Sequence, residues 1–271
     1  MLAANRNESL SKSYTRSADR SAPRDRAHVK VEEHCVGNFD PSVWVTAVDV
    51  GTGNGALQTW PARFGDDPTQ PLLAKRPDFG AQLWSQGGPA VVYDNVGEAH
   101  QLSTLDLSTV DSATIGVNYQ VSATGATRIL FLYGGTLTWN GKTLHYGVGN
   151  GDVGYSVAGD GAGNPDHIEI TNDALASQPR STVIVVDRSL NGSDQIKFYD
   201  AAGAMAKSTA VNANVTGNFG PPGTCYIGAE NDGASGASDA VIRDVVVWPI
   251  ALGQQEATAA ARALSKLARL S

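Results

Sequence analysis

Short runs in which hydrophobic and polar residues alternate fill the middle of the chain. Residues of type Gly, Asn, Asp and Pro separate these runs. The runs are ATIGVNYQV (113–121), TRILFLYG (127–134), TLHYGVG (143–149), DVGYSV (152–157), HIEIT (167–171), STVIVVDR (181–188) and DQIKFYDA (194–201). Regular short strands with turn signals between them predict a β-sandwich or jelly roll. Within this set, residues 183–186 are apolar throughout, which predicts a central strand.

The segment 241–248 predicts a second central strand, because it is apolar on both faces. Strict alternation places two groups of side chains on opposite faces: Ile242, Val246 and Trp248 on one, and Val245 and Val247 on the other. Pro249 has no backbone N–H to donate to a neighbouring strand, so we expect the strand to end there.

The last residues predict one amphipathic helix over 253–269. Alanine and leucine recur there at helical spacing: Ala257, Ala260, Ala261, Leu264, Leu267 and Ala268. Glu256 lies near the expected positive end of the helix dipole, and three basic residues lie toward its negative end: Arg262, Lys266 and Arg269. We expect the Ala/Leu stripe to pack against the sandwich.

Composition fits this picture of many strands and tight turns. The chain has 271 residues, 30 glycines and 12 prolines, and all-β domains commonly run to about 200–250 residues. The two cysteines, Cys35 and Cys225, allow at most one bridge, and two free thiols fit such sparse usage better. No apolar run approaches the roughly 20 residues of a membrane span, and the polar N-terminus lacks a signal-peptide core. We therefore expect synthesis in the cytoplasm.

Charge divides the chain into two parts. Residues 1–34 hold seven Lys/Arg and five Asp/Glu, and the remainder holds 13 basic and 22 acidic residues, a net charge of −9. The first part lacks apolar periodicity and cannot bury enough surface to fold alone. We therefore divide the chain into an extended polar arm, 1–35, and a sandwich domain, 36–271. The acidic body argues against nucleic acid as a partner.

One glycine motif suggests a different fold. Residues 45–58, VTAVDVGTGNGALQ, are similar to the first glycine loop of S-adenosylmethionine-dependent methyltransferases. That loop must open a helix whose N-terminus faces the ligand. Here Trp60-Pro61 interrupts the segment, and no alternating strand–helix units follow. The motif without its context is therefore weak evidence.

A longer stretch, 57–102, carries a resemblance to a known family. It contains QTWPARFGDDPTQP, KRPDF and GGPAVVYDNVGEAHQL. These segments resemble the laminin-G-like, concanavalin A-type sandwiches of many phage and bacterial proteins. The matching residues are Trp60, Gly65, Asp66, Arg76, Pro77, Gly88, Pro89, Ala90, Val91, Tyr93, Asp94 and Leu102. Ala62 and Asn95 depart from the pattern, where Asp and Gly are usual.

The resemblance extends over about 44–270 and implies an all-β, concanavalin A-like jelly-roll sandwich with an N-terminal arm and one C-terminal helix. A buried tryptophan, an Arg-Pro corner and an alternating strand are scaffold features. The matching residues therefore support a fold rather than a site.

Catalytic patterns of the family are missing from the sequence. Laminarinase-type relatives carry Glu-x-Asp-x-x-Glu on one strand, and alginate-lyase relatives carry an Arg/Glu/Arg strand and a Gln-Ile-His strand. None of these occurs here, and no Gly-x-Ser-x-Gly elbow occurs either. The five histidines show no ligand spacing, so we do not expect catalytic zinc. The sequence predicts a protein that is not an enzyme.

Two kinds of ligand remain open. Oxygen-bearing residues in two turn clusters could bind calcium, although turn chemistry accounts for the same residues: Asp160, Asn164, Asp166, Asn231 and Asp232. A glycan would need an aromatic platform, for which the candidates are Trp139, Tyr146 and Tyr155, with Trp84 behind them. Aromatic residues on strands belong more often to a core.

These observations favour a virion structural protein, with a capsid decoration or head-associated protein as the first interpretation. Cytoplasmic synthesis, a polar arm and a lectin-like body support it. We expect residues 1–34 to bind the major capsid protein or another virion protein, and the basic residues of the arm to take part: Arg16, Arg20, Arg24 and Arg26. A homo-oligomer in the assembly and host-surface glycans as ligands fit the same interpretation. The alternatives are a tail or head fibre component and a separate carbohydrate-binding or carbohydrate-cleaving protein.

Overall fold

The computed structural model describes most of the chain after residue 40. The described residues are 41–51, 54–80, 82–94, 97–121, 128–133, 144–148, 154–159, 165–169, 178–190, 194–203, 205–207, 217–220, 225–229 and 239–269. The arm predicted over 1–35 lies outside these ranges.

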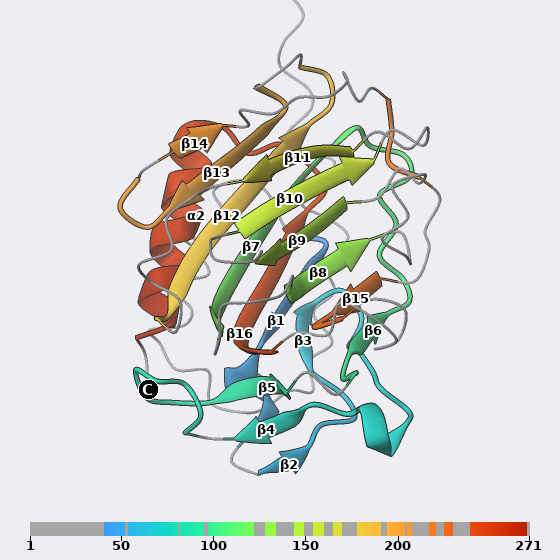
Figure 1. Ribbon diagram of the computed structural model, residues 1–271, viewed down its shortest axis with the longest axis vertical. Helices are drawn as coiled ribbons and strands as arrows, with labels where there is room; N and C mark the ends of the chain where they lie inside the picture. The colour runs from blue at the N-terminus through green and yellow to red at the C-terminus, as the bar shows by residue number, and fades with distance from the viewer. Residues whose placement is uncertain are drawn as a thin grey trace, which may run out of the picture.

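Two antiparallel sheets face each other (Figure 1). The larger sheet has ten strands: β1 (Val43–Thr46), β2 (Gly55–Ala56), β3 (Ala62–Phe64), β4 (Asp78–Gly80), β5 (Ala90–Asp94), β7 (Ser112–Val121), β12 (Arg180–Asp187), β13 (Ile196–Asp200), β14 (Met205–Lys207) and β16 (Asp239–Trp248). The smaller sheet has six: β6 (His100–Leu102), β8 (Arg128–Tyr133), β9 (Leu144–Val148), β10 (Gly154–Gly159), β11 (Pro165–Glu169) and β15 (Cys225–Ile227). Two short 3-10 helices, η1 (Ala47–Val50) and η2 (Leu73–Lys75), lie in the connections.

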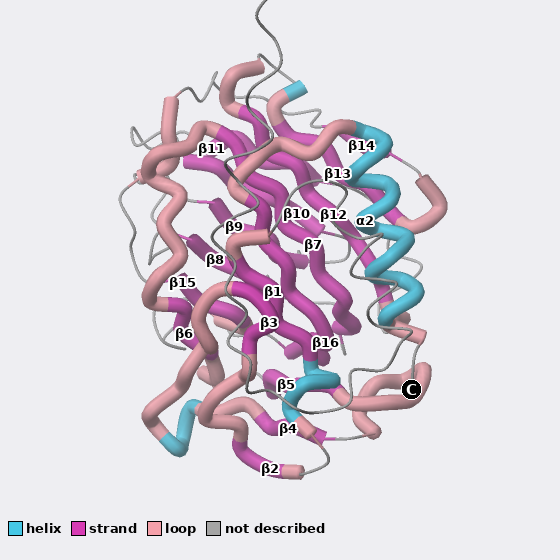
Figure 2. Tube along the Cα trace, turned by 180° about the vertical axis from the view of Figure 1, so that it is seen from behind, coloured by secondary structure: helices cyan, strands magenta, loops and turns pink. Residues whose placement is uncertain are grey.

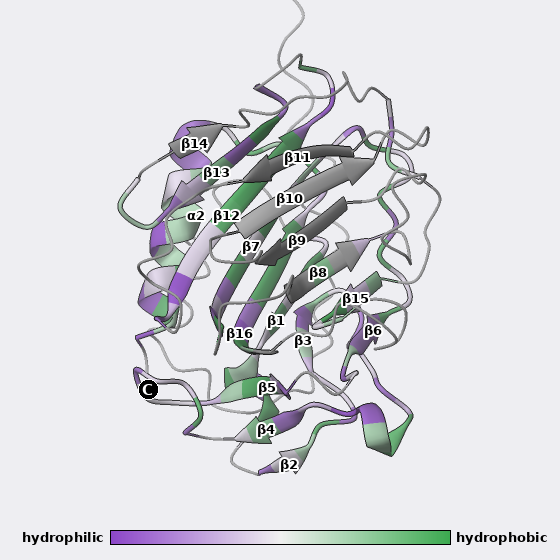
Figure 3. Ribbon diagram, viewed as in Figure 1, coloured by the Kyte–Doolittle hydropathy of each residue, from purple (hydrophilic) through white to green (hydrophobic). Residues whose placement is uncertain are grey.

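The main core lies between the sheets. Val91, Ile115 and Val117 of the larger sheet and Phe131 and Ile227 of the smaller sheet belong to one buried cluster. Hydrophobic residues run along the central strands β12, β7 and β16 (Figure 3). The all-β sandwich of the concanavalin A type with one C-terminal helix is thus confirmed, and so are the strands predicted between residues 113 and 201.

The C-terminal helix α2 (Gln254–Leu267) covers the other face of the larger sheet (Figure 2). Its buried stripe was predicted from the sequence and packs into a second cluster with Val183, Val185 and Trp248. The backbone N–H of Gly253 donates to the Glu256 carboxylate at 2.8 Å, so this side chain caps the helix start. The predicted packing of the helix on the sandwich is confirmed.

Strand β16 occupies the centre of the larger sheet, as its apolar character predicted. It pairs with β7 along one edge, and its other edge is shared by β5 and β1. The predicted alternation is wrong at one residue. Ile242 lies on the inner face with Val245 and Val247 rather than with Val246 and Trp248. The register shifts between Ile242 and Asp244, so Arg243 is the extra residue of a β-bulge that changes the phase of alternation.

Several residues of the family resemblance are scaffold, as expected. Trp60 is fully buried, and the Arg76 guanidinium donates to the carbonyl oxygens of Gln70 and Pro71, both at 2.9 Å. No helix follows the glycine loop at 51–55 within the described residues, because Gly55 begins β2. Cys225 is buried, and its Sγ lies 3.9 Å from the Leu105 carbonyl oxygen, whereas Cys35 lies outside the described residues.

Candidate functional site

The smaller sheet has one face toward the core and one away from it, and strand register assigns residues to each. Phe131 pairs with Tyr146, and Leu132 pairs with His145. Phe131 is fully buried in the core between the sheets. Paired residues of antiparallel strands lie on the same face, and neighbours along a strand lie on opposite faces. Position 146 therefore lies on the core face and position 145 on the outward face.

The register continues this outward face across β10 and β11. Val157 of β10 pairs with His145 of β9 and with His167 of β11, so these three positions form one transverse row. In the adjacent row, Tyr155 pairs with Gly147 and with Glu169. Positions 145, 155, 167 and 169 thus share one face of the sheet by register. Figure 1 shows these strands in front of the larger sheet, with α2 beyond it.

The predicted glycan-binding residues are separated by this arrangement. Tyr155 lies on the outward face, Tyr146 lies on the core face, and Trp139 lies outside the described residues. Trp84, placed behind them in the sequence-based hypothesis, is buried in a small cluster with Ala90 and Ala268. Tyr155 is therefore the candidate that the register best supports.

The other predicted site residues stay predictions. Of the calcium candidates, Asp166 lies on β11, and Asp160, Asn164, Asn231 and Asp232 fall outside the described residues. Arg16, Arg20, Arg24 and Arg26 of the arm fall outside them too. Within the described part of the chain, no group of three or more His, Cys, Asp or Glu residues could hold a metal ion. The described residues also contain no helix that could span a membrane.

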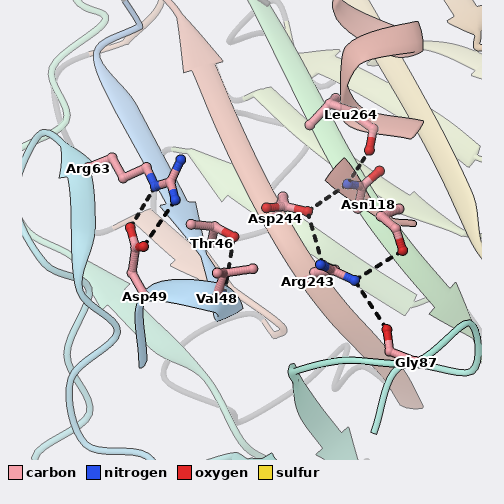
Figure 4. Close-up of polar contacts among 10 residues, drawn as sticks. Thr46, Val48, Asp49, Arg63, Gly87, Asn118, Arg243, Asp244 and Leu264 are labelled. Carbon is pink, nitrogen blue, oxygen red and sulfur yellow. Dashed lines mark hydrogen bonds and ion pairs between the residues drawn. The ribbon is translucent and has the colours of Figure 1, made fainter. Parts of the chain in front are cut away.

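A buried polar network connects β7 and β16 to α2 (Figure 4). Asn118 Nδ2 donates to Asp244 Oδ2 at 2.6 Å and to the Leu264 carbonyl oxygen at 2.8 Å. Arg243 Nη1 donates to the Ala268 carbonyl oxygen at 3.0 Å. Both side chains of the Arg243–Asp244 ion pair are fully buried, with Nε and Oδ2 4.0 Å apart.

This network holds the helix rather than a ligand. Burial lowers the pKa of Arg243, and the neighbouring Asp244 carboxylate raises it. The guanidinium lies at the negative end of the α2 dipole, where a cation is favoured. The bulge at Arg243 makes this possible, because it puts Arg243 and Asp244 on the helix-covered side of a mostly apolar strand. Sequence reasoning missed the network, although Arg-Asp within VIRDVVVW was a visible signal.

A second charged group lies near the start of the chain's described part (Figure 4). Arg63 Nε donates to Asp49 Oδ2 at 2.6 Å, and Nη2 donates to Oδ1 at 3.0 Å. The guanidinium also lies 5.0 Å from the centre of the Trp44 ring, and Phe64 stacks on the same ring. These contacts cover Trp44, which is 1% exposed. The group is therefore part of the packing.

A third polar group joins Tyr93 of β5 to His100 of β6. Tyr93 Oη lies 2.9 Å from His100 Nδ1, and His100 Nε2 lies 3.1 Å from the Leu57 carbonyl oxygen. A carbonyl only accepts, so Nε2 carries the proton and Nδ1 accepts from the tyrosine hydroxyl. Burial lowers the pKa of His100 to about 3, although the bond to Leu57 opposes this shift. His100 is a neutral residue of the core.

Glu98 lies two residues before this histidine and is mostly buried. Its Oε2 accepts from the Asp94 backbone N–H at 3.0 Å. Burial raises the pKa of Glu98 to about 7; the hydrogen bond from Asp94 lowers it, and the Asp94 and Asp78 carboxylates raise it. This carboxyl group gains its charge near neutral pH and makes the stability of the fold sensitive to pH.

Comparison with known proteins identifies a fold rather than a family. No protein-family model matches the sequence. No curated protein matches it either. Among solved structures, the carbohydrate-binding module CBM40 of the Ruminococcus gnavus IT-sialidase, bound to α2,3 sialyllactose, is similar over 63% of this chain and 94% of its own. The TM-score is 0.50 and the identity is 13%.

Trypanosoma rangeli sialidase is also similar in structure. The match covers 89% of this chain and 38% of that protein, with a TM-score of 0.50 and 13% identity. Its complex with 2,3-difluorosialic acid matches over the same shares, with a TM-score of 0.51 and 12% identity. Identities this low show the fold alone. The chain has the antiparallel β-sandwich fold that carbohydrate-binding domains share.

Proposed function

We propose that this chain is a carbohydrate-binding β-sandwich without catalytic activity, and that its ligand binds to the outward face of the smaller sheet. The register of β9, β10 and β11 carries the proposal, because it puts Tyr155 on that face between Gly147 and Glu169. A sugar ring offers an apolar face to an aromatic residue and hydroxyl groups to polar neighbours. The fold shared with a sialyllactose-bound module supports the same ligand class.

The proposal that the protein is not an enzyme rests on its sequence. Hydrolysis of a glycosidic bond uses two carboxyl groups that flank the bond, and no strand carries the paired acidic pattern of the catalytic relatives. On the outward face, the rows at Tyr155 and Val157 contribute one carboxylate, Glu169, from these three strands. A single carboxylate there suits a hydrogen bond to a sugar hydroxyl.

A glycan array with the full-length chain tests the proposal, followed by titration calorimetry with the best ligand. Tyr155→Ala should weaken binding at least tenfold, since loss of a central aromatic contact costs more than about 1.4 kcal/mol. Ser156→Ala is the matched control, because the next position along β10 lies on the core face. No binding to any glycan, or equal affinity in both variants, would refute the proposal. Release of reducing sugar would refute the absence of catalysis.

A finer version of this function is a virion structural protein. We propose that residues 1–34 anchor the chain to the major capsid protein or to another virion protein, and that the sandwich projects from the particle as a homo-oligomer made in the host cytoplasm. The polar, weakly basic composition of 1–34 supports it. A variant that starts near Val36 should fold but not bind particles. Full occupancy by that truncated variant would rule out anchoring through the arm, and co-purification with tails would favour a fibre component.

A further inference from the structure

Three basic side chains form an exposed ridge at the C-terminal end of the chain. Arg262 and Lys266 lie four residues apart on one face of α2, and Arg269 follows in the turn after the helix. All three are exposed, and their side chains form no hydrogen bond or ion pair with any residue that the structure describes. The helix dipole favours a cation in the last turn, but Arg262 lies before that turn. The ridge can therefore meet an anionic partner.

Two acidic side chains lie on the same side of the larger sheet. Asp78 of β4 pairs with Val92 of β5, and Val92 pairs with Val241 of β16. Val241 packs against a buried cluster that includes Ala268, at the end of α2, so this row lies on the face that the helix covers. Asp94 is two residues beyond Val92 and shares that face. Both aspartates are exposed, and Asp78 lies two strand spacings, about 10 Å, from Val241.

Apolar residues lie between and beside the two charged groups. Val92 and Val241 are half-buried and lie between the end of α2 and Asp78. Leu83 is 44% exposed, and its side chain lies over Gly80 of β4, in the adjacent row of the same face. Figure 2 looks onto this side of the molecule, with α2 and, below its C-terminal end, β5 and β4. The face thus changes from basic through apolar to acidic.

We propose that this face binds the same face of a second copy of the chain and forms a dimer with two-fold symmetry. Each contact of such an interface occurs twice, so a surface with a basic end, an apolar centre and an acidic end is complementary to itself. A two-fold axis through the apolar centre brings the ridge of each copy onto the aspartates of the other.

The charge of the whole body favours this choice of surface. Residues 35–271 hold 13 basic and 22 acidic residues, a net charge of −9, so two copies repel each other in most orientations. Attraction requires a basic surface on one copy to face an acidic surface on the other, and the two-fold arrangement does this twice. The dimer goes beyond the proposed glycan binding, and it requires neither a glycan nor a virus particle.

Sedimentation equilibrium of the full-length chain at about 50 mM and about 500 mM NaCl tests the proposal. The expected mass at low salt is that of two chains, and the dissociation constant should rise at least tenfold at high salt, because salt screens exposed charges. The ridge variant, Arg262→Glu with Lys266→Glu, and the acidic variant, Asp78→Lys with Asp94→Lys, should each weaken the dimer at least tenfold. An equimolar mixture of the two variants should restore it, because opposite charges then meet in both contacts.

Leu83→Ser tests the apolar centre without any change of charge and should also weaken the dimer at least tenfold. Leu73→Ser is the matched control, because Leu73 is 69% exposed on η2, at the opposite edge of the molecule from α2 (Figure 2). This control should dimerise as the wild type does. Circular dichroism checks that every variant is folded, and if a charge-reversed variant does not fold, the two leucine variants decide the outcome.

Three results would overturn the proposal: a wild-type chain that stays monomeric at every concentration, a dimer that tolerates Leu83→Ser as well as Leu73→Ser, and a mixture of the charge-reversed variants that stays monomeric. A mass that grows beyond two chains with concentration would show head-to-tail association and would also overturn the two-fold dimer. The glycan array is read separately. A dimer that binds no glycan refutes the proposed function alone, and a monomer that binds a glycan refutes the dimer alone.

Discussion

The contact between Gly116 of β7 and Leu264 of α2 gives a quantitative test of how the helix packs on the sheet. A Cβ atom at Gly116 would lie 2.7 Å from Leu264 Cδ1 and 3.3 Å from Trp248 Cζ3. The leucine side chain therefore occupies the space left free by the glycine. Gly116→Ala should cost about 1–3 kcal/mol from overpacking, partly offset by about 0.4–1 kcal/mol from the lower entropy of the unfolded chain.

The second substitution, Leu264→Ala, removes the side chain that would clash. Leu264 is 1% exposed, so this change should cost about 2–5 kcal/mol through lost burial and a cavity. In the double variant, the alanine methyl group at position 116 enters space that Leu264 has vacated. The double variant should therefore lose less stability than the sum of the single variants, by about 1–3 kcal/mol.

Urea unfolding followed by tryptophan fluorescence measures the four free energies of this cycle, since Trp44, Trp60, Trp84 and Trp248 are buried. Gly116→Ala combined with Leu102→Ala is the control, because Leu102 lies on β6 in the facing sheet and should add within about 0.5 kcal/mol. Additivity within the same margin for Gly116 and Leu264 would refute the packing of the helix through this pair.

Two further predictions concern the buried Arg243–Asp244 network and the close packing of Gly228 against Tyr93. Asp244→Ala leaves the buried Arg243 without the Asp244 carboxylate and should lower the free energy of unfolding in urea by about 3–5 kcal/mol. Asp49→Ala, at the more exposed pair with Arg63, should lower it by about 0–1 kcal/mol. Equal losses of stability in the two variants would contradict the role of burial. Gly228→Ala should cost about 2–6 kcal/mol in thermal unfolding, because Gly228 has a φ of +92° and a Cβ there would overlap the Tyr93 ring. A melting temperature within 2 °C of the wild type, below the shift of about 2–4 °C expected per kcal/mol, would contradict that contact.

Local patterns were enough to predict the strands between residues 113 and 201, the central position of β16 and the helix stripe. They failed where a single residue changed the periodicity. The bulge at Arg243 moves Ile242 to the inner face, and no alternation rule places a bulge without knowing the partner strand. The row formed by His145 and His167 also depends on strand pairing, so spacing along the chain could not reveal it.

The pH dependence of stability should follow two groups near β6 that act in opposite directions. His100 has a folded pKa of about 3 against 6.5 unfolded, so the unfolded chain binds the extra proton between these values. The contribution of His100 to the free energy of unfolding therefore falls by about 3–5 kcal/mol as the pH drops from 6.5 to 3. Glu98 has a folded pKa of about 7 against 4.5 unfolded, so the folded chain holds the extra proton. The stability that Glu98 contributes is fully present below pH 4.5 and is lost as the pH rises through 7.

Glu98→Gln separates the two effects, because the amide oxygen can still accept from the Asp94 N–H and carries no charge. The variant should match the wild type near pH 4.5 and exceed it by about 2–3 kcal/mol at pH 8, where burial of the Glu98 charge is no longer a cost. The exposed Asp66→Asn is the control and should stay within about 0.5 kcal/mol of the wild type at both pH values. Urea unfolding across this range measures the difference. A gain for Glu98→Gln that is the same at pH 4.5 and pH 8 would show that the carboxyl group does not titrate in the folded protein near neutral pH.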